Sequence, residues 1–183
     1  DAGQRVLAQK ELQPKEAYRR HAKGNSLYRN RGDGTFEETG GAEGVEMGRW
    51  AWSSDGIDFD NDGVPEIFIT TGMLSNSSDH DLESFFWRRI AAASPVAARS
   101  EAAYENGWNA LGQKIHEDYS FAGAQPNVFY VRRGGRYYDF SGVSGLDDPF
   151  DSRTFAVTDL DGDGNLDLII KNRLAPQIRA FQN

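Results

Sequence analysis

A long segment of the sequence occurs twice, and this repetition constrains the fold more than any other feature. Residues 34–45 read GTFEETGGAEGV, and residues 135–146 repeat their glycines and apolar positions as GRYYDFSGVSGL. The same spacing carries the acidic stretch DFDNDGVPE (58–66) onto DLDGDGNLD (159–167). We therefore expect two copies of one structural unit.

Each copy reads as four short strands. SLYRN, a glycine-rich turn and TFEET form a hairpin pattern, RWAWSSDGI leads into the acidic stretch, and EIFIT leaves it. The apolar runs 67–69 and 168–170 lack polar alternation, which predicts strands that are covered on both faces. The tail IRAFQN (178–183) resembles the opening of a third copy. Four strands in about fifty residues is the size of a propeller blade, so the sequence predicts a mainly β fold of propeller-like blades.

The two copies are separated by a segment with a different periodicity. DLESFFWRRIAAAS and GWNALGQKIHEDY carry apolar residues at helical spacing, with Asp79 or Asp81 able to cap the first helix and Pro95 ending it. This insertion is expected to pack on the sheets as a helical hairpin, or to protrude as a contact element. The predicted organisation is an N-terminal, partly helical arm, a first repeat, the helical insertion, a second repeat, and the start of a third repeat or an edge strand, at 1–24, 25–73, 74–125, 126–173 and 174–183.

The acidic stretches have the chemistry of cation sites. Calcium takes six to eight hard oxygen ligands, which alternate positions of a tight loop supply compactly. An EF-hand is excluded, because Ile69 and Ile170 stand where it needs a glutamate and because strands flank the loops. Magnesium fits less well, since it prefers octahedral sites that keep several waters, and two solvated acidic turns are the remaining alternative. The pattern predicts two calcium sites with side-chain or carbonyl ligands from Asp58, Asp60, Asp62, Val64, Glu66, Asp159, Asp161, Asp163, Asn165 and Asp167.

The combination of LYRN, a GDGTF turn and DxDxDG loops resembles the FG-GAP or VCBS repeats of integrin-like bacterial β-propellers. The resemblance covers about 25–72 and 127–183. It implies bladed four-stranded sheets, calcium in the loops, and secretion or display at the cell surface. Pro65 and Glu66 depart from the usual small residue and aspartate of the loop, and the helical insertion is not part of the basic repeat.

Composition excludes several classes of function. The net charge of −8 argues against a nucleic-acid partner, and no apolar run is long enough for membrane insertion. The chain has no cysteine, so a disulfide scaffold and a thiolate metal site are excluded. The acidic residues that a glycosidase would need are already accounted for as metal ligands. We therefore expect no enzymatic activity.

Two repeats do not close a propeller, which needs four to eight blades. Open sheet edges invite pairing with another chain, so we expect self-association into a homo-oligomer or filament, with an extracellular structural or adhesive role. The alternative is a fragment of a larger secreted propeller that binds a protein or glycan ligand or supports an enzyme. The chain begins with Asp1, which indicates a mature or trimmed product and leaves export open.

Three short features carry weaker signals. Arg31-Gly32-Asp33 spells an adhesion tripeptide, but the repeat itself requires a turn there. Asn76 begins a glycosylation sequon that has meaning only in a secreted chain. The three histidines lie in different segments without the spacing of metal ligands.

Overall fold

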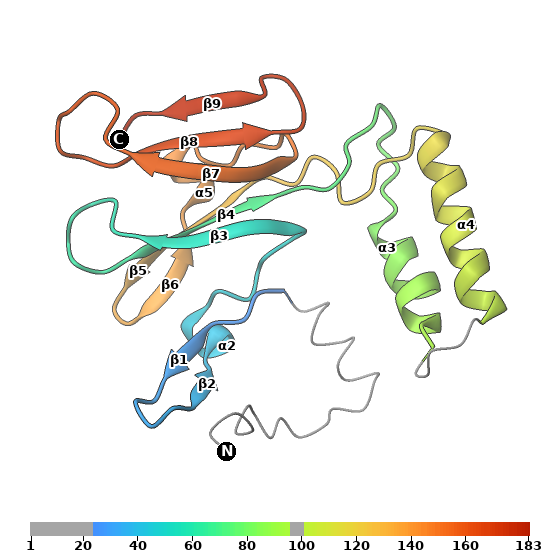
Figure 1. The fold of residues 1–183 in the computed structure, drawn as a ribbon, viewed down its shortest axis with the longest axis horizontal. Helices are drawn as coiled ribbons and strands as arrows, with labels where there is room; N and C mark the ends of the chain where they lie inside the picture. Colours follow the sequence, from blue (N-terminus) through green and yellow to red (C-terminus); the bar gives the residue numbers. More distant parts are fainter. Residues whose placement is uncertain (1–23, 96–100) are drawn as a thin grey trace, which may run out of the picture.

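The computed structural model describes residues 24–95 and 101–183. Within these ranges the strands form three antiparallel sheets, which lie one beside the next, with two helical segments off to one side (Figure 1). The predicted mainly β fold of antiparallel strands is confirmed. Most of the predicted N-terminal arm (1–24), including its weak helix, lies outside the described residues.

The sheets contain two, four and three strands. They are, in spatial order, β1 (Tyr28–Asn30) and β2 (Phe36–Glu38); then β3 (Ala51–Ile57), β4 (Glu66–Thr71), β5 (Val128–Arg133) and β6 (Arg136–Asp139); then β7 (Ser152–Thr158), β8 (Asp167–Asn172) and β9 (Ile178–Phe181). A single helical turn follows each of the hairpins β1–β2 and β5–β6, namely α2 (Gly40–Glu43) and α5 (Ser141–Ser144).

The two copies have the same strand register. Ala51 pairs with Thr71 at the start of β3, Ser152 pairs with Asn172 at the start of β7, and an irregularity follows at the same place in both pairs. Strand β9 lies beside β8 as β5 lies beside β4. The repetition in the sequence is therefore a repetition of structure.

The sequence copies nevertheless do not coincide with the sheets. The four strands of one sequence unit were expected to form one sheet, but β3 and β4 of the first copy pair with β5 and β6 of the second. Strand β4 becomes a central strand in this arrangement, which buries its apolar side chains and satisfies its backbone on both sides. The helical insertion thus interrupts a single sheet, between β4 and β5.

Two apolar clusters explain which strands are buried. One cluster fills the space between the four-stranded and three-stranded sheets, and the other lies on the opposite face of the four-stranded sheet against Val45. Strand β4 is therefore covered on both faces, as predicted. Strand β8 is covered on one face only: Ile170 is fully buried, whereas Ile169 and Lys171 are half-buried. The prediction of two covered faces is wrong for β8, because no further sheet in the described residues packs on its outer side.

The insertion contains the two helical segments that the sequence predicts. The first runs through α3 (Glu83–Phe85), the π-turn η1 (Phe86–Ile90) and the 3₁₀ turn η2 (Ala91–Ala93), and the second is α4 (Ala102–His116). They share a separate apolar cluster, centred on Leu82, Ile90 and Leu111. The segments lie beyond the ends of the strands and do not cover a sheet face (Figure 1). No helix in the described ranges is long and apolar enough to span a bilayer.

Candidate metal centres

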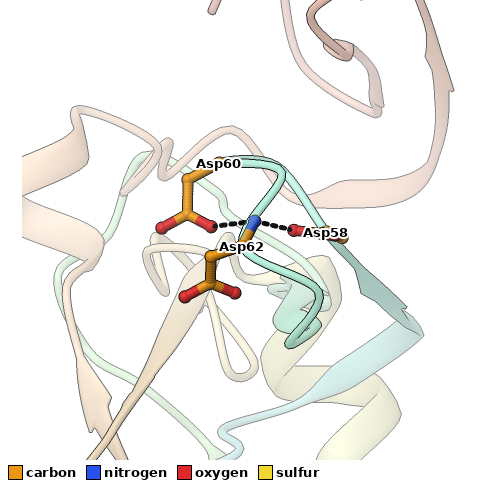
Figure 2. A group of neighbouring side chains, drawn as sticks. All are labelled: Asp58, Asp60 and Asp62. Atoms are coloured by element: carbon orange, nitrogen blue, oxygen red, sulfur yellow. Dashed lines mark hydrogen bonds between the residues drawn. The ribbon is translucent and has the colours of Figure 1, made fainter.

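The first acidic loop closes the hairpin between β3 and β4. Asp58, Asp60 and Asp62 each offer one carboxylate oxygen, and these oxygens lie within 4.8 Å of one another. Figure 2 shows the three side chains gathered at one bend of the loop. The alternate spacing in the sequence therefore brings these three predicted ligands together.

Backbone amides hold these carboxylates in place. The Asp62 amide donates to Oδ1 of Asp58 at 3.0 Å and to Oδ1 of Asp60 at 3.3 Å (Figure 2). The Gly63 amide donates to Oδ2 of Asp58 at 3.0 Å. Gly63 has a φ of +83°, a backbone conformation that residues with a side chain rarely adopt, which favours glycine at this bend. The loop backbone is thus arranged to orient three carboxylates.

Glu66, at the start of β4, lies behind the loop and is 2% exposed. Its Oε2 accepts a hydrogen bond from the Phe59 amide at 3.0 Å, while Oε1 is buried without a hydrogen-bond partner. Burial raises the pKa of this carboxyl, and the charges of Asp60 and Asp62 add to the increase. A buried, unpartnered carboxylate oxygen is costly unless a proton or a cation balances its charge. The environment of Glu66 is therefore compatible with its predicted role as a ligand.

The second loop, between β7 and β8, also gathers three carboxylates, but Asp167, the equivalent of Glu66, takes the place of the equivalent of Asp62. Asp159, Asp161 and Asp167 each offer an oxygen within 4.8 Å of the others. The amides of Gly162 and Gly164 donate to the two oxygens of Asp159 at 2.7 and 3.0 Å. Asp167 is 1% exposed and accepts from the Leu160 amide at 2.7 Å, as Glu66 accepts from Phe59.

Some predicted ligands do not join these clusters. Asp163 in the second loop accepts from the amide and the side chain of its neighbour Asn165, at 2.8 and 3.0 Å. Glu66 is not among the three clustered residues of the first loop. The ligand roles of Glu66 and Asp163, and of the Val64 and Asn165 carbonyls, stay predictions.

Sequence reasoning missed the groups that contact the loops from neighbouring strands. The guanidinium of Arg133, at the end of β5, lies 3.4 Å from Oδ2 of Asp60 and 3.9 Å from Oδ2 of Asp62. At the second loop Gln182 donates to Asp161, and the Asn183 amide donates to Asp167 at 2.9 Å. No loop motif contains these residues. Only the pairing of β5 with β4, and of β9 with β8, reveals them.

The donor set of each loop suits a hard divalent cation. All the clustered ligands are carboxylates, and calcium binds such oxygens in flexible geometries of six to eight ligands. Among the described residues no histidine joins either cluster. When bound, the cation would neutralise the carboxylates that the loop backbone gathers. Asp58, Asp60 and Asp62 would hold it in the first loop, and Asp159, Asp161 and Asp167 in the second.

The other short sequence features have local structural roles. Asp33 accepts hydrogen bonds from the amide and the hydroxyl of Thr35, at 2.9 and 2.6 Å, and Arg31 pairs with Glu37 at 3.5 Å. The tripeptide therefore forms the turn of the β1–β2 hairpin. The side-chain amide of Asn76 donates to the Tyr119 carbonyl at 3.0 Å and is thus engaged in the fold.

Comparison with known families identifies the repeat. The family described as the FG-GAP-like repeat matches residues 17–69, which include β1 to β3, the first acidic loop and the first part of β4. No curated protein matches the chain. The second copy lies outside the matched residues, and we identify it as a copy because β7 and β8 pair in the same register as β3 and β4.

Proposed function

We propose that this FG-GAP-like repeat protein is a non-enzymatic module that binds calcium in both acidic loops and acts outside the cell in structure or adhesion. The observation that carries the proposal is the repeated loop itself. Two hairpins, related by the same register, each gather three carboxylate oxygens within 4.8 Å. In the first loop the unpartnered buried oxygen of Glu66 adds a group that a cation would satisfy.

Calcium binding in the loops would stabilise the fold. The carboxylates repel one another when no cation lies between them. Because only the folded hairpin brings them together, the free energy of calcium binding adds to the free energy of unfolding. Extracellular calcium modules commonly have a Kd of about 0.1–1 mM. At 10 mM calcium this corresponds to about 1.4–2.7 kcal/mol of stabilisation per site.

Thermal unfolding with and without calcium tests this proposal. We expect addition of calcium after chelation to raise Tm. Asp60→Asn and Asp161→Asn should each remove part of the increase, and the double variant should remove nearly all of it. Asp147→Asn is a matched control, because Asp147 is an exposed aspartate outside both loops. An equal Tm in calcium and in chelator would contradict the proposal.

The repeat family supports the proposed non-enzymatic role and the proposed extracellular location. FG-GAP repeats are typically structural or ligand-binding modules and are usually extracellular. The two acidic clusters gather their carboxylates in the manner of metal ligands. We therefore assign the carboxylates to metal binding and none of them to a reaction.

Self-association is the second part of the proposal. Strand β9 forms one edge of the three-stranded sheet, and its Ile178 is 60% exposed. The four-stranded sheet has a further strand, β6, at the corresponding place. An exposed edge with an apolar side chain is a template for pairing with another strand. A second copy of this chain that pairs along β9 would extend the sheet and allow a filament.

Light scattering in calcium tests self-association. Wild-type protein should form particles larger than one chain, and Ile178→Lys should reduce their size because a charge on an edge strand opposes pairing. Val143→Lys is the control, since Val143 is 81% exposed but lies in the helical turn α5 and not in an edge strand. A monomer at all micromolar concentrations would refute self-association.

That same result would favour a second candidate, in which the chain is part of a larger secreted propeller that binds a glycan or protein ligand or supports an enzyme. The strand counts favour it. In the described residues only the middle sheet has four strands, while its neighbours have two and three. Further strands of a longer chain would complete both.

A further inference from the structure

The two acidic loops have different electrostatic surroundings. Arg133 ends β5 and is held by its own hairpin: its Nη1 donates to the Arg132 carbonyl at 2.9 Å. The turn that follows consists of Gly134 and Gly135, both with positive φ, and the pairing of β5 with β4 places this end of the hairpin beside the first loop. From there Nη2 donates to Oδ2 of Asp60 at 3.4 Å.

No positive group of the described residues forms an ion pair with the second loop. Its contacts with the neighbouring strand come from Gln182 and from the backbone amide of Asn183, which are neutral. The difference follows from the sequences of the two neighbouring strands, since the loops themselves have equivalent aspartates. The first loop also accepts a hydrogen bond from a neutral group, since the Asn183 side-chain amide donates to the Phe59 carbonyl at 2.8 Å. Among the described residues, a positive side chain therefore pairs with the first loop and not with the second.

We propose that Arg133 is an internal counter-ion of the first loop and competes with calcium for its carboxylates. The β5–β6 hairpin, which carries Arg133, therefore affects the calcium affinity of the first loop and not that of the second. This inference rests on the proposed function, because it concerns how the same carboxylates bind the cation. It assigns control of calcium affinity to a residue outside the loop motif. Calcium in the first loop then releases the hairpin end, whereas calcium in the second loop does not.

The competition has a direct electrostatic cause. Arg133 pairs with Asp60 and Asp62, which are two of the three clustered ligands. A guanidinium stays charged at all relevant pH values, so it repels an incoming divalent cation and must give up at least part of its ion pairs. The side chains are about half exposed, at 54% for Arg133, 45% for Asp60 and 44% for Asp62. Solvent screening therefore limits the effect, and we expect a change in Kd of about threefold to tenfold.

NMR spectroscopy can measure the two loops separately. The amides of Gly63 and Gly164 donate to the first aspartate of their own loops, so each resonance reports calcium binding in one loop. In a calcium titration, Arg133→Gln should lower the Kd at Gly63 by about threefold to tenfold and leave the Kd at Gly164 unchanged. Arg133→Lys, which keeps the charge, should remain closer to wild type than Arg133→Gln. In 1 M salt the effect of Arg133→Gln should shrink.

Arg88→Gln provides the matched control. It removes one exposed arginine from the helical insertion, which lies at the opposite end of the strands from the first loop (Figure 1). It should change neither Kd. Unchanged resonances of the β5 amides away from the substitution would show that Arg133→Gln keeps the hairpin folded.

The possible outcomes separate this inference from the proposed function. An unchanged or raised Kd at Gly63 in Arg133→Gln, with both loops still binding calcium, would overturn the competition and leave the proposed function intact. A raised Kd would mean that Arg133 orients the ligands. If neither glycine resonance responds to calcium in the wild type, the proposed function and this inference are both overturned.

Discussion

Truncation of two neighbouring side chains of β8 should have unequal costs. Ile170 points into the cluster between the two larger sheets and is 0% exposed, whereas Ile169 lies on the other face of the strand and is half-buried. Ile→Ala at a fully buried site costs about 2–5 kcal/mol, from lost burial and the cavity that remains. At a half-buried site water already reaches the side chain, so we expect about half that cost for Ile169→Ala.

Urea unfolding in saturating calcium measures the difference. Both variants lose a β-branched residue from the same strand, so the change in strand propensity largely cancels in the comparison. A gap of about 2 kcal/mol in the free energy of unfolding would correspond to about 4–8 °C in Tm for a chain of this size. Equal losses for the two variants would mean that both faces of β8 are covered, which contradicts the one-sided burial of this strand.

Two further stability predictions concern single side chains. Burial raises the pKa of Tyr130 to about 12. The folded state therefore keeps this proton when the unfolded chain loses it, and stability should fall as pH rises from about 10 to 12. Urea midpoints in this pH range should fall less steeply for Tyr130→Phe than for wild type. Identical slopes would contradict the raised pKa. Gly44→Ala should destabilise the protein more than Gly145→Ala in the same assay. Both glycines have positive φ, but only at Gly44 would the new Cβ lie 2.8 Å from a backbone oxygen, that of Tyr137. Equal losses of stability would show that the backbone near Gly44 shifts without an energetic cost.

The local elements were predictable because the sequence repeats them. Two copies of a hairpin pattern and of an acidic loop fix the strands and the gathering of Asp58, Asp60 and Asp62, since alternate residues of a tight loop face one centre. The helical insertion was also predictable, from its change of periodicity. These features depend on contacts within short segments.

The features that the sequence did not reveal depend on pairing between distant segments. The pairing of Ile67 with Tyr130 across the insertion places strands of different copies in one sheet. The same pairing brings Arg133 to the first loop. Burial of β8 on one face depends on which sheet packs beside it, and the apolar run 168–170 contains no information on that neighbour.

Isothermal titration calorimetry of the chelated protein with calcium tests the central claim most directly. We expect two calcium ions to bind per chain. We expect one ion after Asp58→Asn or Asp159→Asn, because each variant removes a carboxylate whose two oxygens organise one loop. No saturable binding up to about 10 mM calcium, tenfold above the highest Kd of such modules, would contradict calcium binding by the loops.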